Sequence, residues 1–324
     1  MAEGWGSQMK NLAIGVLLAA LVLPVAVAGQ AVYDKNRKRE PGARSWQAAK
    51  TKLPPFNPPR MPDGTPNLQG RWGGSSSGDD IEETEYIDIT TPPAESWVAE
   101  PADGKVPYRP WALAERNRHR AGLARGWPGE TGARLYVDPQ TFCLKSVPRY
   151  AQRGFELVQN PNHVVMMLNW GHYYRSIPLD GRPHPAPTAK FWMGSSRGRW
   201  DGDTFVVEVT NLNAKMWLDS VGNFYTDNAR VTERFTLVDA NTLDYNVTIE
   251  DPATFTRPLK LDYALHRAGT GGCAECGGVS RQTDADPYEK ESWEHACHEG
   301  NGIHIEGAQD LGFTWYTGAK PPAK

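Results

Sequence analysis

The chain has 324 residues, a length that suits one large β domain or two ordinary ones. Its 26 prolines, 32 glycines, 12 tryptophans and 12 tyrosines favour a turn-rich, aromatic-rich β protein over a helical bundle. The net charge of -3, together with the lack of aromatic residues interleaved among lysines, argues against nucleic-acid binding.

The first element is an apolar segment at residues 12–28, which follows Lys10 and ends in the small-residue sequence Ala-Val-Ala. Its 17 residues and Pro24 make it short for a membrane span, whereas they suit the apolar region and cleavage site of a signal peptide. We therefore expect a cleaved signal peptide over residues 1–28 and a mature protein in the bacterial periplasm or secreted. A retained membrane anchor is the alternative.

Residues 29–66 are rich in proline and basic side chains, and few apolar residues recur in them. This composition predicts an extended arm, either a solvated tether or a segment held near anionic lipid. Residues 79–103, by contrast, carry nine acidic side chains and no basic one. They either pack against the arm or form an exposed acidic loop.

A β domain is expected over residues 67–324. It opens with GRW at residues 70–72, a Gly-x-Trp pattern typical of the start of lipocalin-like barrels, and a short helix is expected at residues 111–123. Alternating apolar and polar runs then follow, separated by turn sequences such as NPN at 160–162 and DGD at 201–203. They predict strands at residues 155–159, 163–170, 172–179, 190–200, 204–210, 230–238, 242–250, 257–266 and 291–298. This meander order favours an all-β fold, an antiparallel up-and-down barrel with a long N-terminal arm.

Strand alternation sorts these side chains into an inner and an outer face. It places Glu233 on the apolar face of residues 230–238 and Arg175 on the apolar face of residues 172–179. Because a buried charge without a partner is costly, we expect both residues to be interior polar groups. A buried ion pair, or an arginine laid over Trp72, would explain them as well as a catalytic role does.

Histidines near strand ends add candidates for proton transfer, because histidine titrates near neutral pH. A histidine on a strand is also commonly a structural residue. The candidate catalytic residues are Glu233, His172, His184, His298 and Glu299. The candidate ligand-binding residues are Arg175, which would orient an anionic or carbonyl group, and Tyr173, Tyr245, Tyr263, Trp72 and Trp192.

Four cysteines in an exported protein predict disulfides. The preferred pairs are Cys143 with Cys297 and, within a glycine-rich loop, Cys273 with Cys276. The oxidising compartment makes a metal site the weaker alternative. Its ligands would be Cys273, Cys276, Cys297 and either His295 or His298.

No HExxH, P-loop or GxGxxG sequence is present, so no cofactor is expected. GSSRG at residues 194–198 precedes a strand and a hairpin, whereas a nucleophile elbow needs a strand-to-helix turn. Any chemistry is therefore expected to be acid–base work of the lyase, isomerase, hydratase or hydrolase type.

Longer stretches between residues 65 and 310 carry a family resemblance. They are FWMGSSRGRWDGDTFVVE at 191–208, VTERF at 231–235, TIEDP at 248–252, LDGRPHP at 179–185, ACHEGN at 296–301 and the segment 143–149. These stretches resemble an uncharacterised family of exported bacterial proteins with lipocalin-like, or calycin-like, β-barrels. The resemblance implies a barrel that encloses a ligand. Residues 269–289, with Cys273 and Cys276, form an insertion that departs from the family pattern.

Two functions follow from such a barrel. The first is a cofactor-independent acid–base enzyme that encloses a small, partly apolar substrate. The second is a non-catalytic periplasmic carrier of a hydrophobic metabolite. The charged residues on the inner face favour the enzyme. A surface interaction module, a third class, would need large exposed apolar patches.

Overall fold

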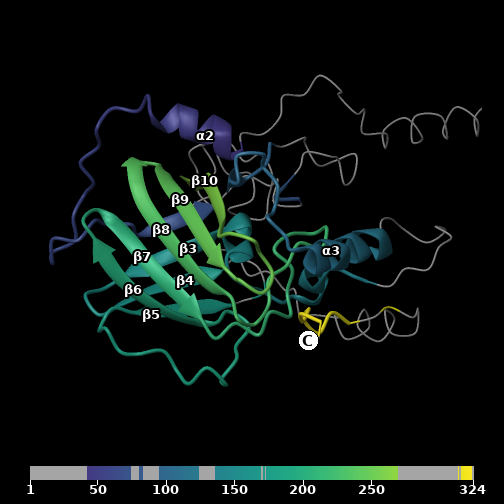
Figure 1. Cartoon of the computed structure of the whole chain (residues 1–324). Helices are drawn as coiled ribbons and strands as arrows, with labels where there is room; N and C mark the ends of the chain where they lie inside the picture. The colour runs from purple at the N-terminus through teal and green to yellow at the C-terminus, as the bar shows by residue number, and fades with distance from the viewer. Residues whose placement is uncertain are drawn as a thin grey trace, which may run out of the picture.

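The protein is a strongly curved antiparallel β-sheet with few helices (Figure 1). The computed structural model describes residues 42–73, 80–82, 95–123, 136–168, 171, 173–268, 313 and 315–322. The expected signal peptide and the predicted strand at residues 291–298 lie outside these ranges. Among the helices within them, none combines the length and the apolar character that crossing a membrane requires.

The sheet is a meander interrupted by one early strand. In spatial order its strands are β5 (Tyr174–Pro178), β4 (His163–Leu168), β3 (Phe155–Gln159), β1 (Gly70–Gly73), β10 (Leu259–Arg267), β9 (Thr242–Glu250), β8 (Arg230–Asp239), β7 (Thr204–Thr210) and β6 (Ser195–Asp201). A short strand, β2 (Val98–Glu100), also pairs with β10. Strand β1 lies between β3 and β10 and therefore joins the two parts of the meander.

The end strands of the sheet, β5 and β6, approach each other and nearly close the barrel. Side chains bridge this seam, because Arg175 Nε on β5 donates to Ser196 Oγ on β6 at 2.8 Å. Gly198 on β6 permits the close approach: an added Cβ would lie 2.6 Å from the Leu179 side chain and 2.9 Å from that of Ile177. The predicted all-β barrel is confirmed at this level.

The predicted strands from residue 155 to residue 266 all correspond to observed strands, β3 to β10. The largest difference is at β6, which begins at Ser195 instead of residue 190. The predicted helix is α3 (Pro110–Gly122), which starts with a proline where the missing N–H costs no helical hydrogen bond.

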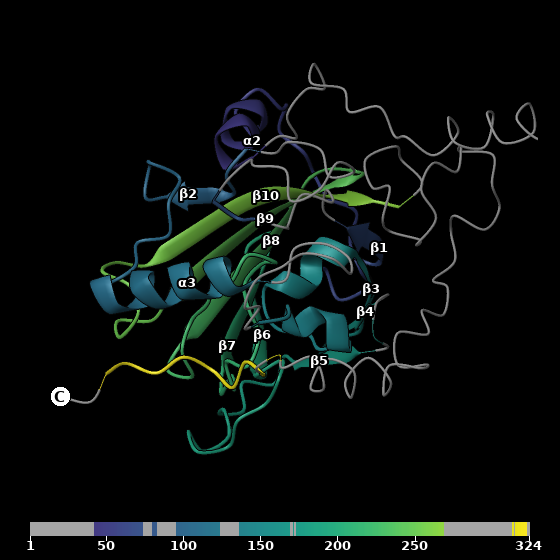
Figure 2. The ribbon, with the colours of Figure 1, turned by 90° about the vertical axis from the view of Figure 1, so that its right-hand side faces the viewer.

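The arm is not extended throughout, and this corrects the prediction from composition. Residues Ala43–Lys50 form helix α2, which lies along the outside of the barrel near β10 (Figures 1 and 2). Trp46 Nε1 donates to Asp244 Oδ1 at 2.7 Å, and Lys50 Nζ lies 2.9 Å from both the Asp244 and the Asp262 carboxylate. Polar contacts with distant strands hold this helix, so composition alone does not reveal it.

Part of the acidic stretch at residues 79–103 packs against the start of this helix. Gly42 N donates to Glu95 Oε2 at 3.2 Å, and Ala43 N donates to Ser96 O at 2.9 Å. Trp97, within the same stretch, is buried. For these described residues, packing against the arm is therefore the arrangement found, not an exposed loop.

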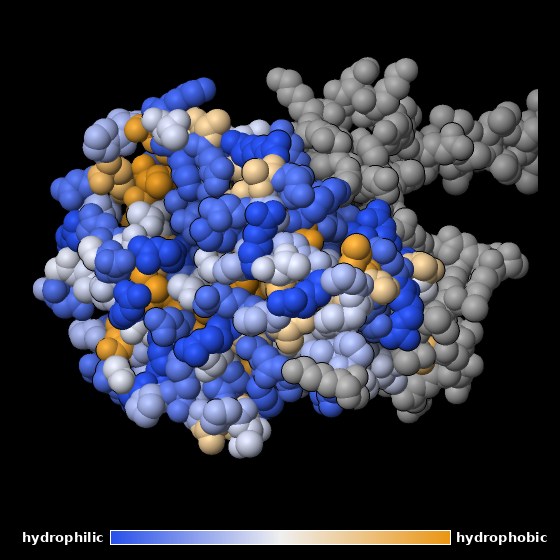
Figure 3. All heavy atoms as spheres, viewed as in Figure 1, coloured by the Kyte–Doolittle hydropathy of each residue, from blue (hydrophilic) through white to orange (hydrophobic). Residues whose placement is uncertain are grey.

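The predicted faces of the long strands are observed. The inner face is buried, and its side chains include Val231, Phe235, Leu243, Tyr245, Val247, Ile249, Leu259, Leu261, Tyr263 and Leu265. The surface seen in Figure 3 is mainly hydrophilic, and its hydrophobic atoms form small separate groups. Among the described residues seen from this side, no large apolar patch of the kind that a surface interaction module would need is visible.

Candidate functional site

Arg175 and Glu233 form an ion pair inside the barrel. Their exposed fractions are 3% and 0%, so both point inward as strand alternation predicts. Arg175 Nη2 on β5 donates to Glu233 Oε2 on β8 at 2.5 Å. The other carboxylate oxygen, Oε1, accepts bonds from Tyr150 Oη at 2.7 Å and Tyr245 Oη at 2.6 Å. Both oxygens of Glu233 are therefore engaged.

The guanidinium of Arg175 is engaged as well. Its Nη1 donates to Tyr150 Oη at 3.0 Å and its Nε donates to Ser196 Oγ, while the group lies 5.2 Å from the centroid of the Tyr150 ring. Burial alone would lower the pKa of Arg175, but the Glu233 carboxylate more than offsets this and raises it. Arg175 therefore stays charged in the interior.

This arrangement matches the buried ion pair that the sequence left open as an alternative to catalysis. Burial raises the pKa of the Tyr150 and Tyr245 phenols, so both keep their protons and donate to Glu233. Protein groups therefore bind both carboxylate oxygens, Tyr150 and Tyr245 at Oε1 and Arg175 at Oε2. The other alternative, an arginine over Trp72, is also found, but the arginine is Arg267, at 4.2 Å from the ring centroid.

The remaining predicted ligand contacts are divided between the interior and the strand ends. Tyr263 is buried, meets Tyr245 edge-on at 5.0 Å and stacks on Trp97 at 4.3 Å between ring centroids. Trp72 is buried, and its indole N–H donates to the Leu68 carbonyl at 2.8 Å. The half-buried side chains just before β5 and β6 are Tyr173 and Trp192.

His184 is the one candidate catalytic histidine within the described residues. Its Nδ1 lies 3.3 Å from Ser195 Oγ at the start of β6. Burial, and then the neighbouring Arg197, lower the pKa of His184. Outside the described residues lie His172, His298 and Glu299.

The cysteine predictions stay predictions. Cys143 is buried, and the other cysteines lie outside the described residues. The same holds for the alternative metal set of Cys273, Cys276, Cys297 and His295. In the described part of the chain, no three His, Cys, Asp or Glu side chains are grouped so that they could hold a metal ion.

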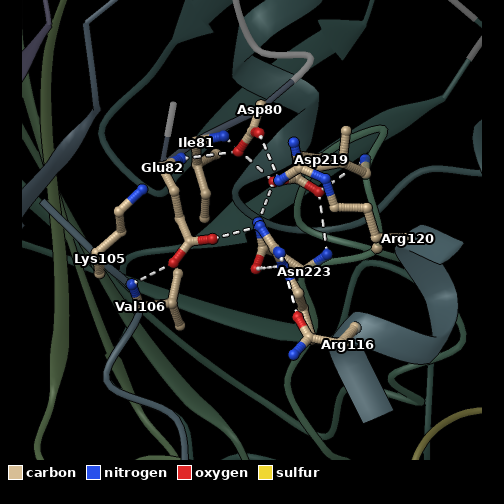
Figure 4. A network of polar contacts seen from close by, with 12 residues as sticks. Asp80, Ile81, Glu82, Lys105, Val106, Arg116, Arg120, Asp219 and Asn223 are labelled. Carbon is tan, nitrogen blue, oxygen red and sulfur yellow. Dashed lines mark hydrogen bonds and ion pairs between the residues drawn. The ribbon is translucent and has the colours of Figure 1, made fainter. Parts of the chain in front are cut away.

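A second polar network, which was not predicted from the sequence, lies beside α3, close to one end of the barrel (Figures 2 and 4). We call it the α3 network. It joins a short segment at residues 80–82, helix α3 and the loop after Trp217, and their side chains point toward one another. Its members are Asp80, Glu82, Arg116, Arg120, Asp219 and Asn223.

Asp219 is fully buried, and its carboxylate accepts four hydrogen bonds. Its Oδ1 accepts bonds from Val221 N at 3.1 Å and Asn223 N at 3.0 Å. Its Oδ2 accepts bonds from Asn223 Nδ2 at 2.5 Å and Ile81 N at 3.2 Å. Burial raises the pKa of Asp219, and these donors oppose the rise by stabilising the charged form.

Asp80 has fewer partners. Its Oδ1 accepts a bond from Glu82 N at 3.0 Å, and its Oδ2 lies 3.5 Å from Arg120 Nη1. Burial and the nearby Asp219 carboxylate raise the pKa of Asp80 to about 7. Since Asp219 has four hydrogen-bond donors, the proton that the two carboxyls share near neutral pH belongs mainly on Asp80.

The two arginines of the α3 network have different roles. Arg116 Nη2 donates to Glu82 Oε2 at 2.5 Å, and Arg116 Nε donates to Asn223 Oδ1 at 3.2 Å. The guanidinium of Arg116 is therefore ion-paired with Glu82. Arg120 lies near Asp80 and also lines a cleft of about 440 Å³. Among the residues that the structure describes, Asn117, Ala121 and Leu123 also line it. Arg120 therefore lies both at the cleft and beside the Asp80 carboxyl.

One sequence signal could have revealed this network. The buried positions of α3 include Ala112, Arg116 and His119, at the spacing of a helix face that packs on a core. Charged or titratable residues at two of these positions indicate that the helix packs against polar partners. Asp219 lies within a largely apolar run and gives a similar signal.

Comparisons with known proteins add no identification. No protein-family model matches the chain, and neither curated proteins nor solved structures yield a match. The family resemblance from the sequence therefore stays a prediction, and the function has to be argued from the two polar clusters.

Replacing Glu233 with Gln should lower the free energy of unfolding by about 3–5 kcal/mol, because Arg175 would keep its buried charge without a carboxylate. The double variant Arg175→Met, Glu233→Leu should recover most of this loss, since it removes both charges and keeps the volume filled. Urea unfolding monitored by circular dichroism measures both. The control is Glu208→Gln on the exposed face of β7. A single variant as stable as this control would contradict the interpretation.

Replacing Asp80 with Asn should flatten the dependence of stability on pH. The pKa of this carboxyl rises on folding from 3.8 to about 7, so the folded protein binds the proton more tightly than the unfolded chain does. The wild type should therefore lose stability as pH rises across that interval, and the variant should lose less. Urea unfolding at about pH 5 and about pH 8 checks this, with exposed Asp203→Asn as control. Equal losses in all three proteins would exclude a raised pKa at Asp80.

Proposed function

We propose that the protein is a cofactor-independent acid–base enzyme whose reaction takes place beside α3, with Asp80 as the group that transfers the proton. One observation carries the proposal: Arg120 lines the cleft and also lies 3.5 Å from the carboxyl of Asp80. A molecule bound in the cleft would therefore contact the residue next to a carboxyl that titrates near neutral pH.

The two carboxyls of the α3 network suit a division of roles. Asp219, with four hydrogen-bond donors, is suited to remain ionised. Asp80, beside it, is suited to gain and lose the proton, because its environment holds the ionised form less well. Environments that push the pKa values of two neighbouring acids apart are typical of acid–base sites. The reaction class stays that of a lyase, isomerase, hydratase or hydrolase.

The interior ion pair supports catalysis less well than the sequence suggested. Glu233 is fully buried, and both of its oxygens bind protein groups. A general base must reach the proton that it removes. Tyr150, Tyr245 and Arg175 already bind the carboxylate oxygens that would have to accept such a proton. We therefore assign the Arg175–Glu233 pair to the stability of the barrel.

The broader setting is part of the same proposal. An N-terminal signal peptide supports a location in the periplasm or outside the cell, and the Gly-x-Trp start of β1 supports a lipocalin-like barrel. The alternative function, a carrier, would place a hydrophobic metabolite among interior aromatic residues. Tyr245, Tyr263 and Phe235 are buried against one another, which gives that alternative less support.

The proposal predicts that the protein changes a small molecule chemically. Purified protein is incubated with a metabolite extract in D₂O, and mass spectrometry identifies compounds whose mass changes. Asp80→Asn should slow that change by at least about 100-fold, since a positioned acid or base contributes roughly this much. The control Arg118→Gln, on an exposed position of the same helix, should leave it intact.

Two results would contradict the proposal. A metabolite that co-purifies and is released unaltered would identify a carrier. Turnover that survives Asp80→Asn but is lost in a folded Glu233 variant would show that Glu233, inside the barrel, is the catalytic group.

A further inference from the structure

We infer that Asn223 is a positioning residue of the site beside α3: its side-chain amide holds Asp219 as a hydrogen-bond acceptor and thereby leaves the transferable proton on Asp80. This role adds a residue to the proposed site and rests on the proposed function for the catalytic meaning of that proton. An NMR titration tests it without any need for turnover.

The loop that carries Asp219 and Asn223 is seated closely on α3. Gly222 has a φ of +94°, and a Cβ added there would lie 2.5 Å from the Cβ of His119, so only a glycine allows this approach. His119 Nδ1 lies 3.1 Å from the Gly222 carbonyl oxygen, and Leu218 N donates to the Asn223 carbonyl at 2.6 Å. These contacts fix the backbone from which the Asn223 side chain reaches its partners.

The orientation of the Asn223 amide follows from the partners on its two sides (Figure 4). Its Oδ1 accepts bonds from Arg116 Nε and from Tyr108 Oη, each at 3.2 Å. Its Nδ2 donates to Asp219 Oδ2 at 2.5 Å. A guanidinium can only donate and a carboxylate can only accept, so a flipped amide would place like groups against each other on both sides. The N–H group of the amide therefore faces Asp219.

Asn223 supplies two of the four donors that bind Asp219. Its backbone N–H donates to Oδ1 and its side-chain amide to Oδ2, so one residue holds both carboxylate oxygens. Both residues are fully buried, and solvent therefore does not replace a lost bond at no cost. Burial raises the pKa of Asp219. Among the groups that oppose this rise, the Asn223 amide acts most strongly, ahead of the Ile81 N–H and the charge of Arg149.

Charged groups from three elements also face the two carboxyls. They are Arg116 and Arg120 from α3, Glu82 from the segment that carries Asp80, and Arg149 at the start of the 3-10 helix Arg149–Arg153. These groups set the general field of the site. The Asn223 amide differs from them because it is a neutral donor that binds Asp219 directly and stabilises only its ionised form.

The place of the proton follows from this bond. Without the Asn223 side-chain donor, ionised Asp219 is held less well and its pKa rises further. The proton that the two carboxyls share then moves from Asp80 to Asp219. Because a neutral Asp219 no longer repels ionised Asp80, the pKa of Asp80 falls. The side-chain amide of Asn223 thus decides which carboxyl is the acid.

The test replaces Asn223 with Leu, which branches at the same carbon but has no hydrogen-bond donor. NMR follows the side-chain carboxyl carbons of Asp80 and Asp219 as the pH is varied. In the wild type, Asp80 should titrate at about pH 7. In Asn223→Leu its midpoint should fall by at least about one pH unit, since a hydrogen bond to a charged group contributes roughly that much. The Asp219 midpoint should rise.

Two further variants separate this role from a general loss of structure. Asn223→Ala removes the amide without adding a larger group, and it should move both midpoints in the same directions as Asn223→Leu. The control is Tyr108→Phe, which removes a buried hydroxyl bonded to the other side of the amide and leaves Asn223 Nδ2 facing Asp219. It should lower the stability but leave both midpoints in place.

Unchanged midpoints in the folded Asn223 variants would overturn the inference, and so would an equal shift in Tyr108→Phe. Failure of the proposed function looks different. The predicted titrations, with no chemical change of any metabolite, would keep the role of Asn223 in placing the proton and remove the enzyme. Turnover that depends on Asp80, with the same pH profile and the same Asp80 midpoint in Asn223→Leu, would keep the enzyme and remove the role of Asn223.

Discussion

A charge inside a barrel must have a partner, and Arg175 and Glu233 meet that requirement for each other. The pair also links strands that backbone hydrogen bonds leave separate, because Arg175 on β5 reaches both Ser196 on β6 and Glu233 on β8. It thus spans the seam where the sheet fails to close. Tyr150 and Tyr245 complete the shell around it, and the interior becomes a packed core.

The two polar clusters differ in their charge balance, and this difference separates stability from chemistry. In the interior one arginine faces one carboxylate, and tyrosine hydroxyls satisfy the remaining bonds. In the α3 network, the three carboxyl groups of Asp80, Glu82 and Asp219 lie beside Arg116 and Arg120. Burial first, and then the nearby Asp219 carboxylate, raise the pKa of Asp80 to about 7. A labile proton therefore belongs beside α3, next to the cleft.

The sequence could predict those features that depend on residues close together along the chain, and not those that depend on distant ones. The inward direction of Glu233 and Arg175 follows from a two-residue period, which is local, and the structure confirms it. Helix α2 depends on contacts such as that of Trp46 with Asp244, 198 positions away, and composition does not encode them. The α3 network depends on a similar meeting, since Ile81 and Asp219 lie 138 positions apart. Asp80, in a stretch of acidic residues, therefore looked like part of a solvated loop as readily as a buried group.

The central claim is that the carboxyl which titrates near neutral pH is Asp80 beside α3, while the Arg175–Glu233 pair stabilises the barrel interior. NMR titration of the Asp80 side-chain carboxyl carbon tests this claim most directly. The predicted result is a pKa of about 7. A pKa near 3.8, the ordinary value of an aspartate side chain, would contradict the claim.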